Sequence, residues 1–240
     1  MGFGYHDYGE LAAKKGVPGM VKSGRYTETD ETHIFGDILQ KAKLEGANAV
    51  LNIGCGCSKP AIDLMEFCRK TGAVCVMVDH PNMIAELKSC SKPPKNVIFI
   101  AGRFPDAKGA VLKAAKSFDS IIVYSTLHYV KGLDCFKFLD EAASLLSPGG
   151  RMLIGDIPNV SKKKRFLSTK WGREFHEKWS GRKAPTAAEI RAMTGQFDDK
   201  RIAQIMQRYR HVGYETYLLK QNEKLPFCYS REDILIVKHK

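Results

Sequence analysis

The sequence has no hydrophobic run that approaches the roughly 18–20 uninterrupted apolar residues of a membrane span. Residues 1–8 also lack the basic-then-apolar order of a signal peptide. The seven cysteines are an odd number and lie mostly in apolar segments, which is typical of reduced thiols rather than of a disulfide framework. We therefore predict a cytoplasmic protein without a membrane span.

The sequence also lacks the residue patterns of two common ligand sites. Cys55 and Cys57 form a C-x-C pair, but no further cysteine or histidine cluster lies near them in the sequence. A structural metal site needs about four ligands, so we expect no metal here and interpret both cysteines as small residues of a tight turn. The pattern G-x-x-x-x-G-K-[ST] does not occur, which excludes a P-loop.

Acidic residues are scarce relative to basic ones, and the formal net charge is +12. The excess is concentrated in residues 159–210, which hold 14 Lys or Arg and 5 Asp or Glu. Such a segment favours an anionic partner, which includes phosphate, carboxylate, nucleic acid and an acidic membrane face. A solvated helical face explains the same charges equally well, so both interpretations stay open at this point.

Short apolar segments alternate with segments of helical periodicity over the first two thirds of the chain. Strands that are apolar on both faces are typical of a parallel sheet, and right-handed crossovers place helices on both of its sides. The predicted strands are residues 49–53, 74–78, 96–101, 119–124 and 151–155, and the predicted helices are residues 32–44, 59–70, 81–89, 109–116 and 133–146.

After Pro158 the pattern changes to a polar, basic and helical stretch that contains both tryptophans. Strand-like runs return only at residues 214–219 and 234–237, for which an antiparallel pair is the simplest arrangement. We therefore predict an α/β fold with a doubly wound, seven-stranded, mostly parallel sheet and a helical insertion after strand five. Residues 1–240 form a single domain, in which residues 1–31 are an N-terminal lid or cap and residues 159–210 are the basic insertion.

The most informative stretch lies where the first predicted strand meets its helix. Gly54 and Gly56 follow a buried strand and precede a helix, and Asp79 closes the next strand. This order brings backbone N–H groups and one acidic acceptor beside a nucleoside-bearing ligand. A dinucleotide-binding G-x-G-x-x-G would need glycine where Lys59 stands, so an oxidoreductase that uses NAD or FAD is disfavoured.

Four motifs in this order resemble those of the class I S-adenosylmethionine-dependent methyltransferases, over about residues 34–155. They are NIGCGCS at residues 52–58, the acid Asp79, FDSIIVYSTLHY at residues 118–129 and LSPGGRMLI at residues 146–154. The resemblance implies a Rossmann-like fold, S-adenosyl-L-methionine as cofactor and S-adenosyl-L-homocysteine as product. Two departures are visible, because Asn52 replaces the usual acid of the first motif and Ser58 replaces its third glycine.

The resemblance also implies which residues bind the cofactor. Asp79 would bind both ribose hydroxyls, because a carboxylate offers two oxygens to two neighbouring donors. Adenine would lie near His80 and residues 102–104, while residues 124–125 would border the methionine part. The implied cofactor site consists of Asn52, Gly54, Cys55, Gly56, Asp79, His80, Gly102, Arg103, Phe104, Tyr124 and Ser125.

Methyl transfer needs an acceptor atom in line with the methyl carbon and the sulfur, and a base helps when the acceptor holds its proton tightly. We choose His128 as the candidate catalytic base, because it lies just past strand four at the carboxyl edge of the sheet. A structural histidine that packs under the cofactor is the alternative interpretation. A phosphate or carboxylate acceptor would need no base at all.

Acceptor recognition is expected from residues 1–30 and from the basic insertion. Trp171, Phe175 and Trp179 recur at four-residue spacing, which we interpret as the core-facing stripe of a helix, with a ligand-binding face as the alternative. The insertion resembles those of small-molecule and sugar methyltransferases. We therefore expect O- or N-methylation of a small anionic acceptor, such as an activated or acidic sugar in surface-glycan synthesis. The candidate acceptor-binding residues are Tyr5, His6, Tyr8, Asp156, Lys162, Lys163, Arg165 and His176.

Two other functions stay open on the sequence alone. The basic stretch also suits an RNA methyltransferase, although residues 125–128 read STLH where base-directed members carry N/D-P-P-[YF]. Asn52 and Ser58, the two departures in the first motif, would also suit a catalytically silent protein that binds S-adenosylmethionine. No motif indicates the oligomeric state.

Overall fold

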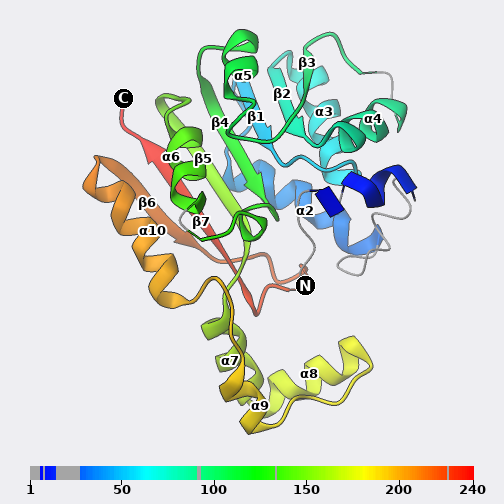
Figure 1. Ribbon diagram of the computed structural model, residues 1–240, viewed down its shortest axis with the longest axis vertical. Coiled ribbons are helices and arrows are strands. Elements are labelled where there is room, and N and C mark those ends of the chain that lie inside the picture. Colours follow the sequence, from blue (N-terminus) through cyan, green and yellow to red (C-terminus); the bar gives the residue numbers. More distant parts are fainter. Residues whose placement is uncertain (1–5, 8, 15–27, 91–92, 133, 226) are drawn as a thin grey trace.

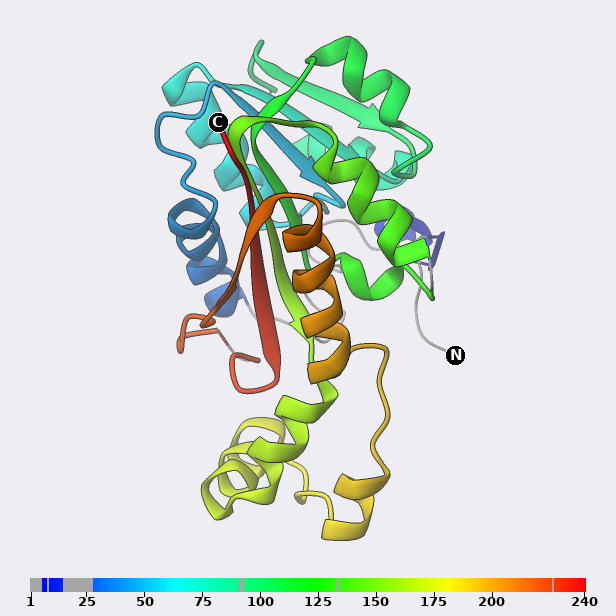
Figure 2. The ribbon, with the colours of Figure 1, turned by 90° about the vertical axis from the view of Figure 1, so that its left-hand side faces the viewer.

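The computed structural model describes residues 6–7, 9–14, 28–90, 93–132, 134–225 and 227–240. Its strands form one sheet with helices on both faces, and further helices extend beyond one end of the sheet (Figure 1, Figure 2). The strands are β1 (Ala49–Ile53), β2 (Val74–Asp79), β3 (Val97–Ala101), β4 (Phe118–Tyr124), β5 (Leu146–Pro158), β6 (Tyr214–Leu219) and β7 (Arg231–Lys238). The helices are α2 (Glu28–Lys41), α3 (Lys59–Thr71), α4 (Pro81–Cys90), α5 (Lys108–Ala114), α6 (Asp134–Ala143), α7 (Val160–Ser168), α8 (Lys170–Ser180), α9 (Ala187–Ala192), α10 (Asp199–His211) and the short 3-10 helix η1 (Leu127–Tyr129).

The sheet has the strand order β3-β2-β1-β4-β5-β7-β6. The strands from β1 to β5 run parallel to one another, and β7 is antiparallel to both β5 and β6. This confirms the predicted doubly wound sheet with its antiparallel C-terminal pair. The chain order reverses between β1 and β4, and in open α/β sheets the crevice at the carboxyl ends of such strands is where ligands bind.

Two hydrophobic clusters flank the sheet, one on each face. Helices α2, α3 and α4 cover one face, while α5, α6 and α10 cover the other (Figure 2). Side chains of a strand point alternately to the two faces, so Leu51 packs in one cluster and Val50 in the other. Burial on both faces explains why β1 to β4 read as nearly continuous apolar runs.

Two strands are longer than the sequence predicted. Strand β5 runs through the predicted turn at residues 148–150, where Gly149 has a φ of +78° and the pairing with β4 shifts register. Strand β7 begins three residues before the apolar run, at Arg231, and it includes the buried acids Glu232 and Asp233. Strand patterns miss buried charges of this kind, because their partners come from distant parts of the chain.

The basic insertion consists of two parts that behave differently. Helices α7, α8 and α9 extend from the carboxyl end of β5, away from the sheet (Figure 1). Helix α10 instead packs on the sheet through Ile202, Ile205 and Tyr209. The tryptophans of α8 are not core residues, since Trp171 is 53% and Trp179 47% exposed. The expectation of a core-facing stripe was therefore wrong.

Before α2, the structure describes a short helical stretch at residues 9–14. Asn82 Nδ2 donates a hydrogen bond of 3.0 Å to the carbonyl of Gly9, which holds this stretch against the start of α4. Among the helices that the structure describes, none combines the length and the apolar character that crossing a bilayer requires.

Candidate active site with two adjoining cavities

The turn between β1 and α3 depends on two glycines with left-handed backbone. Gly54 has a φ of +72°, and a Cβ atom there would lie 2.4 Å from Thr126 Oγ1. Its N–H donates to the carbonyl of Val78 at 2.8 Å, which fixes the turn against β2. Gly56 has a φ of +64° with nothing within 4 Å of the Cβ position. A ligand can therefore approach the backbone closely at Gly56.

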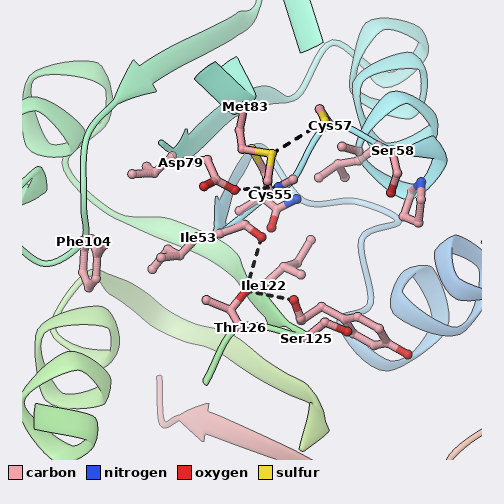
Figure 3. A pocket seen from close by; sticks show the side chains of 18 of the residues that line it. Ile53, Cys55, Cys57, Ser58, Asp79, Met83, Phe104, Ile122, Ser125 and Thr126 are labelled. Carbon is pink, nitrogen blue, oxygen red and sulfur yellow. Dashed lines mark hydrogen bonds between the residues drawn. The ribbon is translucent and has the colours of Figure 1, made fainter. Parts of the chain in front are cut away.

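Asp79 lies across from this turn, at the carboxyl end of β2 (Figure 3). Its Oδ2 accepts a hydrogen bond of 2.7 Å from the N–H of Gly56, and its Oδ1 accepts one of 2.6 Å from the N–H of His80. Burial raises the pKa of the Asp79 carboxyl above its ordinary value, and the two backbone donors offset part of that rise. The arrangement holds one buried carboxylate beside the open face of the glycine turn.

A cavity of about 260 Å³ opens in front of Asp79 and the glycine turn. Ten of the eleven residues of the predicted cofactor site line it, and His80 is the exception. Helix α2 also lines this cavity and was not part of the predicted site. The four-residue spacing of its apolar residues indicates one buried face but not which element that face covers. Lining residues absent from the predicted site include Glu31, Ile34, Phe35, Ile38, Met83, Thr126, Tyr129 and Val130.

The N-terminal segment covers His80. The ring of His6 meets that of His80 edge-on at 5.8 Å, and a Cβ atom at Gly9 would lie 2.2 Å from His80 Nδ1. His6 therefore lies beside the cofactor half of the site. Of the predicted lid residues, Tyr5 and Tyr8 lie outside the described residues.

Ser125 and Asp156 form the junction between β4 and β5. Both have positive φ angles, +52° and +57°, and Ser125 Oγ donates a hydrogen bond of 2.5 Å to Asp156 Oδ2. The Asp156 N–H in turn donates to Asp233 Oδ1 at 2.8 Å, and Arg231 Nε lies 3.5 Å from Asp156 Oδ1. Asp156 is 1% exposed and lines neither of the two cavities described here. It holds Ser125, which does line the first cavity.

A second cavity, of about 500 Å³, lies between the end of β5, helices α7 and α8, and residues 227–231. Three of the predicted catalytic and acceptor residues line it, namely His128, Lys163 and His176. Helix η1 borders both cavities, because Tyr129 lines the first and His128 the second. The rings of these two residues lie 4.1 Å apart.

Two other predicted acceptor residues make structural contacts instead. Lys162 Nζ donates a hydrogen bond of 2.6 Å to the carbonyl of Arg231 and lies 3.2 Å from Glu232 Oε2. Arg165 forms an ion pair with Asp199 at the start of α10. Neither residue lines the second cavity. The sequence could not separate them from Lys163, because all three belong to one run of positive charges.

The first cavity suits a cationic nucleoside ligand. Its charged lining residues are the carboxylates Glu31 and Asp79 and a single cation, Arg103. Apolar side chains such as Ile53 and Phe104 complete the walls, which suits a flat base. Among the residues that the structure describes, no three His, Cys, Asp or Glu side chains group in a way that could hold a metal ion.

Residues 51–154 match the family described as "Methyltransferase domain". An O-methyltransferase family protein from Burkholderia thailandensis aligns over 100% of this chain and 64% of its own, with a TM-score of 0.63 and 14% identity. The plantazolicin methyltransferase BpumL, in complex with SAH, aligns over 98% of both chains with a TM-score of 0.58 and 12% identity.

Human N-acetylserotonin methyltransferase, in complex with SAM, aligns over 95% of this chain and 60% of its own, with a TM-score of 0.54 and 14% identity. This chain thus spans less than two thirds of the length of the Burkholderia and human structures. No curated protein matches the sequence. Fold, glycine turn and matched family agree: residues 51–154 match a methyltransferase domain, and the chain has the Rossmann-like fold of the aligned methyltransferase structures.

Proposed function

We propose that the protein transfers the methyl group of S-adenosylmethionine to a small anionic acceptor bound in the second cavity. The observation that carries this proposal is that η1 borders both cavities, with Tyr129 in the lining of the first and His128 in that of the second. The charged residues that line the second cavity are Lys163 and Arg231, and the described lining contains no carboxylate. A cavity lined by this sign of charge favours an anion.

In this scheme the residues of the chain bind the cofactor and orient the acceptor. S-adenosylmethionine supplies an electrophilic methyl group when bound, so alignment of the acceptor contributes much of the acceleration. The Asp79 carboxylate would accept from the ribose hydroxyls, and the open backbone at Gly56 would allow the ligand to lie close to the turn. The hydrogen bond of 2.5 Å from Ser125 to the buried Asp156 fixes Ser125 in the wall of the first cavity.

His128 is our candidate for the base that takes the acceptor's proton. Its side chain lines the second cavity, one residue from a side chain that lines the first. An imidazole at that position can accept a proton from a hydroxyl or amine that attacks the methyl group. A carboxylate or phosphate acceptor would leave this histidine with a packing role only.

The competing functions predict different substrates. Several cations of the insertion are engaged within the protein, as in the pairs Lys162–Glu232 and Arg208–Asp140, which weakens the argument for an RNA surface. An activated or acidic sugar and an O- or N-linked product stay predictions from the sequence. The cysteines characterised in the structure are all free thiols, which supports a reducing, cytoplasmic setting.

Methyl transfer from radiolabelled S-adenosylmethionine tests the proposal. The purified protein is incubated with a small-molecule extract or with total RNA, and label is then measured in each fraction. We expect label in the small-molecule fraction, in compounds that an anion-exchange resin retains. Label in RNA alone would establish the competing function, and bound S-adenosylhomocysteine without any transfer would indicate a silent binding protein.

A further inference from the structure

We propose that the acceptor is a flat aromatic anion, whose ring lies between aromatic side chains of the second cavity and whose acidic group pairs with Lys163. This inference rests on the proposed function and names the substrate class for the same site. Three observations carry it. The walls of the cavity are aromatic, one of its positively charged side chains has no partner within the described part of the chain, and several of its uncharged polar side chains already have partners.

Aromatic rings form two groups on the walls of the second cavity. In the first group Phe166 stacks on Tyr229 with ring centroids 5.0 Å apart and planes 10° from parallel, and Phe175 meets both rings edge-on. In the second group Trp179 meets Phe227 edge-on at 5.1 Å. All five rings line the same cavity of about 500 Å³. Such walls favour a flat ring, because aromatic pairs gain energy from stacked and edge-on contacts.

Trp179 shows that other parts of the chain leave these cavity walls partly exposed to solvent. Its side chain is 47% exposed although it lines the cavity. Large exposed aromatic groups beside a cavity are typical of ligand sites, since a ligand removes their apolar surface from water. An aromatic occupant would bury the Trp179 ring together with its own.

The four consecutive basic residues of α7, residues 162–165, differ in the contacts that they make. Lys162 pairs with Glu232, Lys164 Nζ donates to the carbonyl of Arg191 at 2.8 Å, and Arg165 pairs with Asp199. Lys163 is exposed and lines the cavity, and its ammonium group has no hydrogen bond or ion pair within the described part of the chain. It is therefore available to an acidic group of the ligand.

Three uncharged polar side chains of the cavity already have partners within the chain, which disfavours a sugar. Asn159 caps α7 and donates to Asp199, Gln196 Nε2 donates to the carbonyl of Val130, and Ser230 Oγ donates to the carbonyl of Phe227. A sugar presents several hydroxyls, each of which needs a partner when it leaves water. A flat aromatic anion needs only the ammonium of Lys163 and the ring faces.

Calorimetric titration with three probes, in the presence of saturating S-adenosylhomocysteine, tests this inference. The probes are 3-hydroxy-2-naphthoate, which is flat and anionic, 2-naphthol, which is flat and neutral, and glucuronate, which is anionic but not flat. We expect 3-hydroxy-2-naphthoate to bind at least about tenfold more tightly than either of the others, as for the loss of one charged hydrogen bond or one set of ring contacts.

Two pairs of variants assign the binding to the cavity. Lys163→Met should weaken 3-hydroxy-2-naphthoate by about tenfold and leave 2-naphthol unchanged, while Lys164→Met on the same helix should change neither. Trp179→Leu should weaken both flat probes, whereas Tyr217→Leu, equally exposed but on β6 and outside the cavity lining, should not. Trp179 and Tyr217 are both half exposed, so these variants are expected to fold.

The outcomes separate this inference from the proposed function. Tighter binding of glucuronate than of 3-hydroxy-2-naphthoate would overturn the aromatic acceptor while methyl transfer to a small anion stands. Absent naphthoate binding in a protein that binds S-adenosylhomocysteine, or binding that neither Lys163→Met nor Trp179→Leu weakens, would overturn it too. Failure to bind S-adenosylhomocysteine would overturn the proposed function itself.

Discussion

At the scale of single residues, we expect cofactor binding to depend most on Asp79. It is a buried carboxylate whose oxygens already accept from two backbone N–H groups, at 2.7 and 2.6 Å. These bonds hold its side chain toward the cavity, so a ligand meets a fixed acceptor rather than a flexible one. Fixed acceptors lose little conformational freedom when a ligand binds.

Replacing Asp79 by alanine should weaken the binding of S-adenosylhomocysteine by about 1.5–3 kcal/mol, because a charged hydrogen-bond acceptor is lost. Calorimetric titration measures the change, with Asp63→Ala as the matched control, since Asp63 pairs with Lys59 at the surface of α3. Unchanged affinity in a folded Asp79→Ala protein would remove this residue from the site.

The same carboxyl group should make cofactor binding depend on pH. Burial raises the pKa of Asp79 above its ordinary 3.8, and a protonated carboxyl offers fewer acceptor sites than a carboxylate. Affinity for S-adenosylhomocysteine should therefore be constant near neutral pH and fall as the pH drops through the raised pKa. Titrations across this range measure the fall. An equal fall in Asp79→Asn would assign the effect to another group.

His128 belongs to η1, which borders both cavities, and a catalytic base there affects turnover rather than cofactor binding. His128→Ala should lower kcat by about 10²–10⁴-fold, as for the loss of general-base catalysis, while affinity for S-adenosylhomocysteine changes little. His211→Ala is the control, since this exposed residue at the end of α10 lines neither cavity. The reverse pattern, weaker binding with kcat preserved, would make His128 a packing residue.

At the scale of elements, α2 is fixed both to the site and to the C-terminal strand pair. Its Glu31 accepts from the N–H of Lys59 at 3.2 Å and so caps α3, where Ser58 makes no side-chain capping bond. Its Lys41 lies 2.7 Å from Asp37 and 2.5 Å from Asp233 of β7. Burial raises the pKa of Asp37, although the Lys41 ammonium opposes this rise.

Removing the charge of Lys41 should be strongly destabilising. Lys41→Met leaves Asp37 and Asp233 buried without their cation, a loss that costs about 3–5 kcal/mol in comparable buried pairs. Urea unfolding measures it against Lys70→Met, whose partner Glu66 is half exposed and for which about 0–1 kcal/mol is expected. Equal, small costs in both variants would show that the network at Lys41 is solvated in solution.

At the scale of the whole molecule, the sheet and the extension formed by α7, α8 and α9 should differ in local stability. Buried residues in α8 and α9 are few, with Gly172 and Ile190 as those described, whereas β1 and β4 are buried almost throughout. Regions with few buried contacts open with lower free energy. We therefore expect the proposed acceptor side of the site to open more readily than the sheet.

Hydrogen exchange should show this division. Amides of α8 should exchange faster than those of β1 and β4, and S-adenosylhomocysteine should slow exchange at residues 54–58 while leaving α8 nearly unchanged. Mass spectrometry of peptic fragments measures both regions in one experiment. Equal protection of α8 and residues 54–58 by S-adenosylhomocysteine would mean that the two cavities form a single cofactor site.

Much of the fold and of the cofactor site was predictable, because local patterns encode both. Apolar runs determine buried parallel strands, and the order Gly54, Gly56, Asp79 places N–H groups and an acid at one edge of the sheet. The pairing of β6 with β7 was predicted, whereas that of β5 with β7 was not. The early start of β7 was also missed, since the buried acids Glu232 and Asp233 interrupt the apolar pattern.

The sequence by itself determined the parallel strands with their helices, the nucleoside-binding turn and the chemistry of its acid, because each depends on neighbours in the chain. Only the tertiary structure decided which cation of residues 162–165 is available and whether the tryptophans face core or solvent. Contacts from Glu232, Asp199 and Tyr229, distant in sequence, settle those questions. Whether a side chain pairs with a distant residue, or is covered by one, depends on how the chain packs, and no local spacing encodes it.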